Sequence, residues 1–371
     1  MKKRVIISVS NDLSTDQRVR KQCSSLLLSG CKITLLGREL KHSLALSRPY
    51  RTKRFKLWFN KGALFYAVLN IRLFFYLLIH KADVYLANDL DTLPANYLIS
   101  RLRNAKLIYD SHEFFTEVPE IQDRPFVKKT WKFFERWMIG RADLVITVNE
   151  SIASLLRETY DLKDVVVVQN LPDAVPEFTP KDRTEIAEPN DHICILQGSG
   201  INVDRGAEEL VEAFCEVEDA VLLIVGDGDA VPDLKRRVEK LGIQKRVIFK
   251  PRMPYTEMMS YTALADVGFS LDKANNINYQ LSLPNKIFDY AYAGVPVLAT
   301  DLKEVRKVLE TYKFGRVVRS LQPSDLAVEI NTFLKDSEAR AEYRKNTELV
   351  VKALNWQSQF NTVLKRMEAF G

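Results

Sequence analysis

The sequence predicts an α/β fold of two doubly wound domains, and three observations lead to this prediction. Short apolar runs alternate with amphipathic helical patterns from one end of the chain to the other. This repeated strand and helix order is typical of a parallel sheet covered by helices. A turn-rich, charged stretch without apolar periodicity, residues 170–191, divides the series in two. The length of 371 residues suits two domains of ordinary size.

The first series of elements opens close to the amino end of the sequence. The run "RVIISVS", residues 4–10, is short and meets polar residues at once, so it predicts a strand rather than a signal peptide. A helix is expected over residues 16–30, ending at Gly30, where a left-handed residue is favoured. The other expected elements are strands at 32–37, 83–89, 106–111 and 143–149 and a helix at 92–104.

The second series of elements follows the linker. Its expected strands lie at 193–199, 220–228, 246–251, 265–271 and 295–300. Each is followed by a helical or loop segment, as the crossovers of a parallel sheet require. In open α/β sheets the ligands bind at the carboxyl ends of the strands, so the loops there are where functional residues are expected.

Composition and charge limit the classes of ligand and of structural site that the sequence suggests. Lys and Arg number 54 against 48 Asp and Glu, a modest and dispersed surplus that favours anionic ligands or a membrane surface over nucleic acid. The four cysteines show no Cys-x-x-Cys spacing, and the four histidines are scattered. Neither a zinc site nor a disulfide framework is indicated, which is typical of a reducing, cytoplasmic compartment.

The most membrane-like stretch runs from Gly62 to His80. Asn70 and Arg72 interrupt it near the middle, so a buried or surface-docked helix is favoured over a spanning one. Basic and aromatic residues alternate in the surrounding segment 48–78. Two interpretations stay open: the segment seats the protein on anionic lipid at the inner face of the membrane, or it is a packed helix beside a solvated basic loop.

Polar residues follow two expected strands of the first domain. His112 and Glu113 come just after the strand that ends near Tyr109, and Asn88 and Asp89 stand at the end of another. A histidine there can bind a ligand hydroxyl or move a proton, although such residues often have only a structural role. Asp91 or Thr92 is expected to cap the next helix.

The loop after the first strand of the second domain contains Gly198, Gly200 and Gly206. Glycines let backbone amides approach a phosphate closely, and Arg205 stands among them. The alternative is a plain turn with a solvated arginine.

The segment "LSLPNKIFDYAYAGVPVLAT", residues 281–300, contains a second cation. Lys286 and Asp289 are three apart, so they share one face if a helix starts near Pro284. A lysine in the first turn opposes the helix dipole, and an anionic ligand would remove that conflict. The alternative is a solvated lysine.

Several site classes are excluded by their missing motifs. The sequence has no complete dinucleotide fingerprint, P-loop, His-Glu-x-x-His or Ser-His-Asp arrangement, and no acidic cluster suggests a metal cage. Separated cations, hydroxyl-binding polar groups and one acid remain. This set suits the binding of a sugar attached to a diphosphate.

Characteristic segments stand in order along nearly the whole chain: "NDLSTDQRVRKQCSSLLLSGCKITLLGR", "ANDLDTLPANYL", "LIYDSHEFFTEVPE", "ITVNESIASLL", "LQGSGINVDRGAEELVEAF", "LLIVGDGDAVPDLKRRVEKLGIQKRVIFKPRMP" and "LPNKIFDYAYAGVPVLAT". Together they resemble family 4 retaining glycosyltransferases of the two-domain GT-B fold, in the subgroup with a Pro-Asn-Lys donor-site motif. The resemblance implies an acceptor-binding domain of residues 1–172 and a donor-binding domain of residues 173–353. It also implies that the helix in 354–371 crosses back to the first domain.

The resemblance assigns donor-site residues one by one. The two diphosphate-binding cations of the family correspond to Ser199 and Arg205, so one is missing, and Lys286 is the candidate replacement. The family's paired glutamates correspond to Leu281 and Asp289, of which only Asp289 can hold the ribose hydroxyls. Pro284 and Asn285 complete the donor contact, together with Gly198 and Gly200.

In the first domain the resemblance places His112 next to the donor sugar. Ser10 and Asn11 match the loop between sugar and acceptor. Asn88, which stands where relatives often have histidine, is given a supporting role on the acceptor side with Asp89 and Glu113.

The function implied is transfer of a sugar, with retention, to an acceptor hydroxyl in surface polysaccharide or glycoconjugate synthesis. The acceptor would be a sugar or a lipid-linked molecule, the co-substrate a nucleotide-diphosphate sugar, and no metal would be required. His112, Arg205 and Lys286 are the expected catalytic residues. A nucleotide-sugar epimerase of the same fold and a non-catalytic nucleotide-sugar-binding subunit remain as alternatives.

Overall fold

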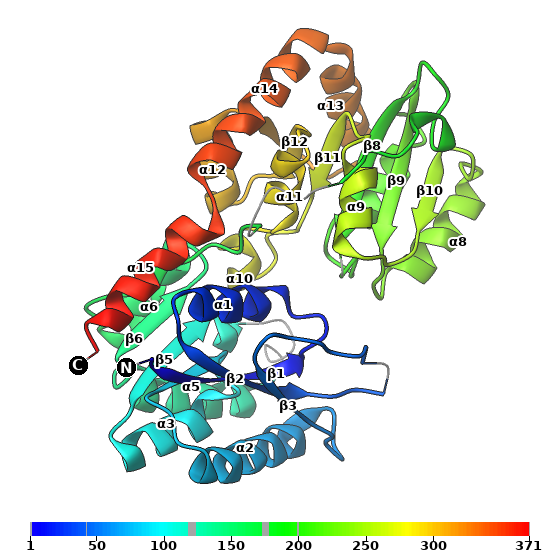
Figure 1. The fold of residues 1–371 in the computed structure, drawn as a ribbon. Coiled ribbons are helices and arrows are strands. Elements are labelled where there is room, and N and C mark those ends of the chain that lie inside the picture. Colours follow the sequence, from blue (N-terminus) through cyan, green and yellow to red (C-terminus); the bar gives the residue numbers. More distant parts are fainter. Residues whose placement is uncertain (1, 42, 118–123, 173–177, 199, 371) are drawn as a thin grey trace. The chain divides into compact units, whose positions relative to one another are not determined.

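Two parallel sheets, one in each half of the chain, organise the structure (Figure 1). The computed structural model describes residues 2–41, 43–117, 124–172, 178–198 and 200–370. Unit 1 consists of Met1–Asn170 and Trp356–Gly371, and unit 2 of Leu171–Asn355. These bounds differ by two residues from the domain bounds expected from the sequence.

Unit 1 is built on a seven-stranded sheet of order β3-β2-β1-β4-β5-β6-β7, in which all neighbours are parallel. The strands are β1 (Arg4–Asp12), β2 (Lys32–Arg38), β3 (Arg51–Phe55), β4 (Val84–Asn88), β5 (Lys106–Ser111), β6 (Leu144–Thr147) and β7 (Val166–Val167). The chain reverses direction across the sheet after β3, which is the mark of a doubly wound fold. The predicted fold class is confirmed.

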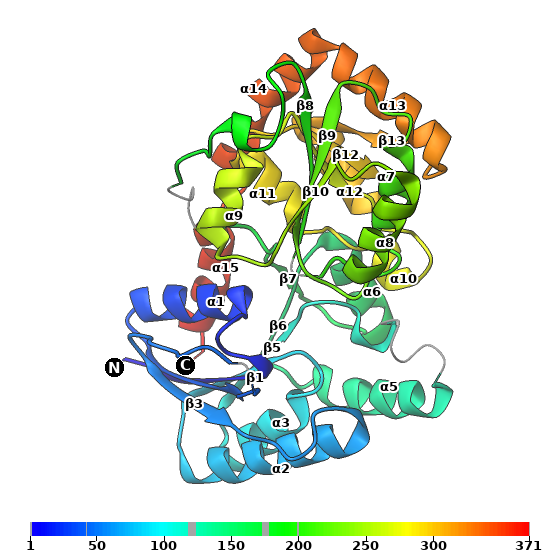
Figure 2. The same ribbon diagram turned by 90° about the vertical axis from the view of Figure 1, so that its right-hand side faces the viewer.

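Helices cover both faces of this sheet. They are α1 (Gln17–Leu28), α2 (Gly62–Ile79), α3 (Leu93–Arg103), α5 (Pro125–Ile139), α6 (Glu150–Tyr160) and α15 (Trp356–Glu368), with a short 3-10 turn η1 (Phe115–Glu117). Helices α1 and α15 lie on one face, and α2, α3 and α5 lie on the other (Figures 1 and 2). Gly30 has a φ of +87°, the left-handed conformation expected after α1.

Helix α2 is the apolar stretch of the first domain. Among the described residues it alone is long and apolar enough to cross a membrane, by length and composition only. A stripe of residues four apart, Phe65, Leu69, Leu73 and Leu77, is buried against the rest of unit 1. The interrupting Asn70 is used internally, because its side chain donates to Asp91 O and accepts from Ala95 N.

The C-terminal helix α15 belongs to unit 1, as expected. Its buried residues include Trp356, Phe360 and Val363, and it packs on α1 and β7. The indole of Trp356 donates a 2.9 Å hydrogen bond to Ser25 Oγ on α1. This unit is therefore assembled from both ends of the chain.

Unit 2 is built on a six-stranded parallel sheet of order β10-β9-β8-β11-β12-β13. Its strands are β8 (His192–Gly198), β9 (Ala220–Gly226), β10 (Val247–Lys250), β11 (Val267–Ser270), β12 (Val297–Thr300) and β13 (Gly315–Val318). Its helices are α7 (Ala207–Ala213), α8 (Val231–Leu241), α9 (Tyr255–Thr262), α10 (Ile277–Gln280), α11 (Lys286–Tyr292), α12 (Lys303–Tyr312), α13 (Pro323–Lys335) and α14 (Ser337–Ala353), with a 3-10 turn η2 (Arg183–Glu185). Helices α7 and α8 lie on the face opposite α9 and α11 (Figure 2).

Tyr290 fixes α11 to the sheet of unit 2. Its ring covers Gly268 of β11, where an added Cβ would lie 2.5 Å from the ring. Its hydroxyl lies 3.0 Å from Phe269 O, to which it donates, and accepts a hydrogen bond of 3.2 Å from Gln197 N. The start of α11 is thereby held beside the carboxyl ends of β8 and β11.

Candidate functional site

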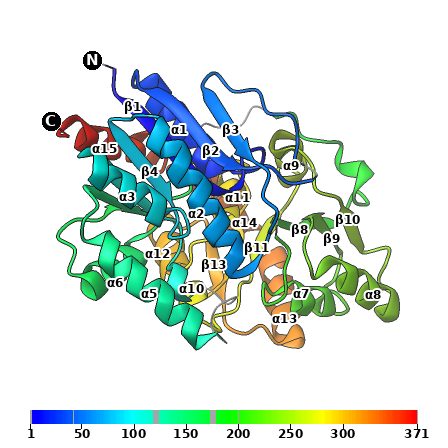
Figure 3. The same cartoon turned by 90° about the horizontal axis from the view of Figure 1, so that it is seen from below.

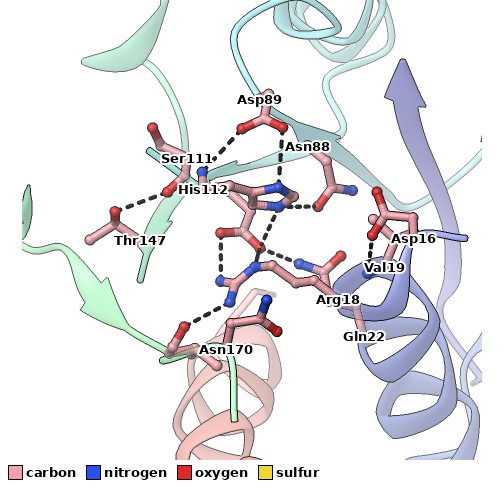
Figure 4. A network of polar contacts seen from close by, with 12 residues as sticks. Asp16, Arg18, Val19, Gln22, Asn88, Asp89, Ser111, His112, Thr147 and Asn170 are labelled. Carbon is pink, nitrogen blue, oxygen red and sulfur yellow. Dashed lines mark hydrogen bonds and ion pairs between the residues drawn. The ribbon is translucent and has the colours of Figure 1, made fainter. Parts of the chain in front are cut away.

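A histidine surrounded by acidic side chains lies at the carboxyl edge of the unit 1 sheet (Figure 4). His112 follows β5, and its Nδ1 lies 3.1 Å from Asp89 Oδ2. Its Nε2 lies 3.1 Å from Asn88 Oδ1 and 3.5 Å from Asp110 Oδ2. The structure thus brings together Asn88, Asp89 and His112, three of the residues predicted from the sequence.

The backbone conformation of Asp89 positions its carboxylate for this contact. Its φ of +60° is left-handed, a conformation that aspartate tolerates better than most residues. One carboxylate oxygen accepts from the backbone N of His112 at 3.1 Å, while the other meets the ring. The loop after β4 and the loop after β5 are therefore joined through one side chain.

Asp110 is the second acid beside the histidine, and sequence reasoning missed it. It is fully buried at the end of β5 and pairs with Arg18 of α1 through two contacts of 3.0 and 2.9 Å. Arg18 also donates to Val168 O at 2.8 Å, and Gln22 Nε2 donates to the same carboxylate. An aspartate inside a strand gave no signal, because its partner lies 92 residues away in the sequence.

These contacts fix the protonation of the cluster. Burial by itself would lower the pKa of His112, but Asp89 and Asp110 outweigh it and raise the pKa to about 10. Burial by itself would raise the pKa of Asp110, but Arg18 and His112 hold it below the ordinary value. At neutral pH the ring is an imidazolium whose two N–H groups point at acceptors of the protein.

We expect unit 1 to lose stability as the pH rises from about 7 towards 10. A base whose pKa is raised on folding stabilises the folded state below its unfolded pKa, near 6.5, and the contribution is lost as the pH passes about 10. The expected slope is about 1.4 kcal/mol per pH unit within that window. Urea unfolding at several pH values between about 7 and 10 measures it.

The matched control for this pH dependence is His112→Gln, which keeps polar contacts but carries no charge. Its free energy of unfolding should change less with pH in the same window. Equal slopes in the two proteins would contradict the assignment. The buried carboxyls of Asp91 and Glu135, whose pKa burial raises to about 7, titrate at the lower end of this window, and both proteins contain them.

The sequence predicted Asp91 or Thr92 as the N-cap of α3, and the prediction is wrong for Asp91. The N-cap is Thr92, and it makes no side-chain cap hydrogen bond, since its hydroxyl donates to Asn88 O. Asp91 is instead 5% exposed and bonded to the side chain of Ser10. Tertiary contact with strand β1 has replaced the local cap.

The remaining predicted residues of unit 1 lie near the same sheet edge. Ser10 is buried within β1, and Asn11 is exposed and donates to Asp16 Oδ2 at 3.1 Å. Glu113 follows His112, and its backbone O accepts from Ser111 Oγ at 2.7 Å.

Unit 2 gathers two cations around one buried acid. Asp272 follows β11 and is fully buried. Its Oδ1 lies 2.6 Å from Arg205 Nη1, and its Oδ2 lies 4.0 Å from Lys286 Nζ. The guanidinium of Arg205 also stacks 4.6 Å from the ring centroid of Tyr279. The structure brings the two predicted cations together, through an acid that sequence reasoning missed.

The charges of this cluster perturb one another. Burial by itself would raise the pKa of Asp272, but Lys286 and Arg205 hold it below the ordinary value. Burial lowers the pKa of Lys286, Arg205 lowers it further, and Asp272 offsets only part of this. Two cations share one carboxylate, so the cluster has a net charge of +1 when Lys286 is protonated.

Gly206 makes the approach of Arg205 to Asp272 possible. Its φ is +72°, and an added Cβ would lie 2.3 Å from Leu271 O at the end of β11. Gly198 and Gly200 have no such requirement, since the contacts of an added Cβ there begin at 3.8 and 3.4 Å. Ser199 lies outside the described residues.

Helix α11 begins at Lys286, two residues later than the expected start near Pro284. Pro284 O accepts from Ile287 N, and Asn285 O accepts from Asp289 N. The carboxylate of Asp289 accepts a 2.8 Å hydrogen bond from the hydroxyl of Tyr255. Leu281 is the C-cap residue of α10.

The predicted catalytic residues are divided between the units, with His112 in unit 1 and Arg205 and Lys286 in unit 2. Within the described parts of the chain, no group of three or more His, Cys, Asp and Glu is arranged to hold a metal ion.

Two family models match the chain. Residues 17–174 match Glycosyltransferase Family 4, and residues 178–350 match Glycosyl transferases group 1. A chitobiosyldiphosphodolichol beta-mannosyltransferase from Yarrowia lipolytica is 22% identical over 358 residues, covering 86% of this chain and 76% of the relative.

Solved structures resemble the whole chain, and two of them serve as examples. A sucrose-phosphate synthase from Thermosynechococcus elongatus has a TM-score of 0.83 at 17% identity, covering 100% of both chains. Anabaena HepE in complex with UDP-glucose has a TM-score of 0.77 at 15% identity, covering 99% of this chain and 100% of that one. At such identities the likeness shows a shared fold.

Proposed function

We propose that this chain, which belongs to the family 4 glycosyltransferases, moves a sugar from a nucleotide diphosphate to an acceptor hydroxyl with retention at the anomeric carbon. The chain is a glycosyltransferase of the GT-B fold. The observation that carries the proposal is the cluster of Arg205 and Lys286 on Asp272, two cations held by a single buried acid.

A diphosphate is the ligand that this cluster suits. Phosphate oxygens would supply the acceptors that one carboxylate cannot give to two cations, and Arg205 offers a planar set of donors. Negative charge grows on the diphosphate as its bond to the sugar breaks. Arg205 and Lys286 would stabilise that charge without a metal ion.

Asp289 would bind the ribose hydroxyls of the same ligand, since it lies on α11 three residues after Lys286. Gly198, Ser199, Gly200, Pro284 and Asn285 complete the proposed donor contact. Anabaena HepE, which shares the fold, was solved in complex with UDP-glucose, so uridine diphosphate is the first nucleotide to test here.

Unit 1 would supply the acceptor side through Asn88, Asp89 and Glu113, and its Ser10 and Asn11 would bind the donor sugar where it faces the acceptor. The imidazolium of His112, whose two N–H groups point at acceptors of the protein, would lie next to the donor sugar. The acceptor oxygen would bond to the anomeric carbon on the face that the diphosphate leaves. Its proton would pass to the departing phosphate oxygen, so no protein base is required.

The proposed localisation is cytoplasmic, at the inner face of a membrane, with segment 48–78 in contact with lipid. The acceptor would be a sugar or a lipid-linked molecule in polysaccharide or glycoconjugate synthesis. The name of the Yarrowia relative describes a lipid-linked acceptor.

The protein is expected to release nucleotide diphosphate from one nucleotide sugar and to form a glycoside on an added acceptor. A panel of uridine, guanosine and adenosine diphosphate sugars, with chromatography and NMR of the products, measures this. An isomerised nucleotide sugar without released nucleotide would establish the epimerase. Tight nucleotide binding without turnover would establish the binding subunit, and a glycoside of inverted configuration would overturn retention alone.

A further inference from the structure

The outer layer of unit 1, made of α2, α3 and α5, presents large apolar side chains to solvent. Figure 3 views this layer face on. The layer is continuous, because ring contacts of Tyr66 with Trp131 and of Tyr97 with Trp137 join α5 to α2 and α3. Only 22% of α2 is buried. Exposed examples are Ile71 (55%), Phe75 (58%), Ile79 (76%), Leu102 (67%) and Phe133 (67%), and Trp58 (82%) is exposed in the segment just before α2.

All charged side chains of the segment that leads into this layer and forms α2 are basic. From Leu40 to Ala82 the sequence has no Asp or Glu, whereas Lys or Arg occurs at positions 41, 48, 51, 53, 54, 56, 61, 72 and 81. Helix α3 has no acid, and the single acid of α5, Glu135, is fully buried. The exposed apolar surface of this layer therefore lies beside side chains that are positively charged.

A basic groove of about 470 Å³ joins the two features at the outer edge of the sheet. Its lining includes Glu39, Lys53, Arg54, Lys56, Arg72 and Phe75. Four cations thus face one carboxylate. Glu39 is 3.9 Å from Arg54 and 3.6 Å from Lys56, while no described carboxylate pairs with Lys53 or Arg72. The groove has a net charge of +3.

The groove and the apolar layer meet at Phe75. This residue lines the groove and belongs to α2, and more than half of its side chain is exposed. Arg72 lies one turn before it, donates to Lys56 O at 3.0 Å and lies over the ring of Trp58. A ligand that carries phosphate next to hydrocarbon fits this order of groups.

We propose that this surface docks on a bilayer of anionic phospholipid, with a head-group phosphate in the basic groove and α2 lying in the plane of the interface. The proposal refines the proposed membrane contact of segment 48–78, and it does not depend on the proposed catalysis. Charge complementarity selects the occupant, because a neutral bilayer would leave Lys53 and Arg72 without a counter-charge. The buried stripe of α2 and the internal bonds of Asn70 keep this helix on the sheet, so only its outer side enters lipid.

Co-sedimentation of the full chain with phosphatidylcholine vesicles, with and without phosphatidylglycerol, tests the proposal. Binding is expected only with phosphatidylglycerol, and it should weaken as salt rises. Lys53→Gln with Lys56→Gln should weaken binding by about tenfold or more. Phe75→Ser with Ile79→Ser should weaken it at every salt concentration, and binding should shift the fluorescence of Trp58 to the blue.

The matched control is Lys32→Gln with Lys365→Gln, two exposed lysines of unit 1 away from the groove. Its binding should equal that of the unaltered chain. Equal binding to neutral vesicles, or no difference between the two double variants, would overturn the proposal. Nucleotide release in vesicle-free buffer is measured in parallel, so that a failure of catalysis is seen separately from a failure of docking.

Discussion

Replacing Arg205 or Lys286 by alanine is expected to lower the rate of glycosyl transfer by about a hundredfold or more. Each removes a cation from the buried carboxylate of Asp272, and the charge that grows on the leaving diphosphate loses its stabilisation. Affinity for nucleotide diphosphate should fall as well. Steady-state kinetics with the donor identified by the panel, together with calorimetric nucleotide binding, measures both effects.

Two further variants sharpen this prediction. Arg205→Lys keeps the charge but loses the planar donors, so it should fall between the wild type and Arg205→Ala. Lys273→Ala is the matched control, because Lys273 adjoins Asp272 in sequence yet pairs with Glu209 at 2.8 Å. Unchanged turnover in both alanine variants would remove the diphosphate assignment.

Arg18→Ala is expected to destabilise unit 1 by about 3–5 kcal/mol. The change leaves the carboxylate of Asp110, which is fully buried, without its main counter-charge. The pKa of Asp110 should rise accordingly. Urea unfolding followed by circular dichroism measures the loss.

Two comparisons test the cause of that loss. Adding Asp110→Asn to Arg18→Ala should recover part of the stability, because no buried charge is then left unpaired. Arg4→Ala breaks a pair with Asp83 in which both side chains are about half exposed, and it should cost less than about 1 kcal/mol. If Arg18→Ala costs no more than Arg4→Ala, the buried pair has no special role.

The fold was predictable because apolar runs and helical patterns alternate strictly. Three strands were missed for physical reasons. Edge strand β3, Arg51–Phe55, is mostly basic and exposed, a composition that protects an edge from pairing but hides it from an apolar pattern. Strand β7 has only two residues, and β13 has four, of which only two are buried.

The candidate site was predictable at strand ends and less so elsewhere. Asn88, Asp89 and His112 were predicted to follow strands, and the structure brings them together because parallel strands end at one edge of a sheet. The partners that set their charge are Arg18, which comes from helix α1, and Asp110, which lies within strand β5 close to its end. Asp272 also follows a strand, but a single acid in a turn gives no sign in the sequence that Arg205 and Lys286 both contact it.

The return of α15 to unit 1 has a consequence for biosynthesis. Residues 1–170 are translated before α15 exists, and the surface of α1 and β7 that receives Trp356 and Phe360 then faces water. It stays uncovered while the whole of unit 2 is being made. The first unit to leave the ribosome is therefore the last to be completed, and during that interval its uncovered surface is a site for chaperones or for aggregation.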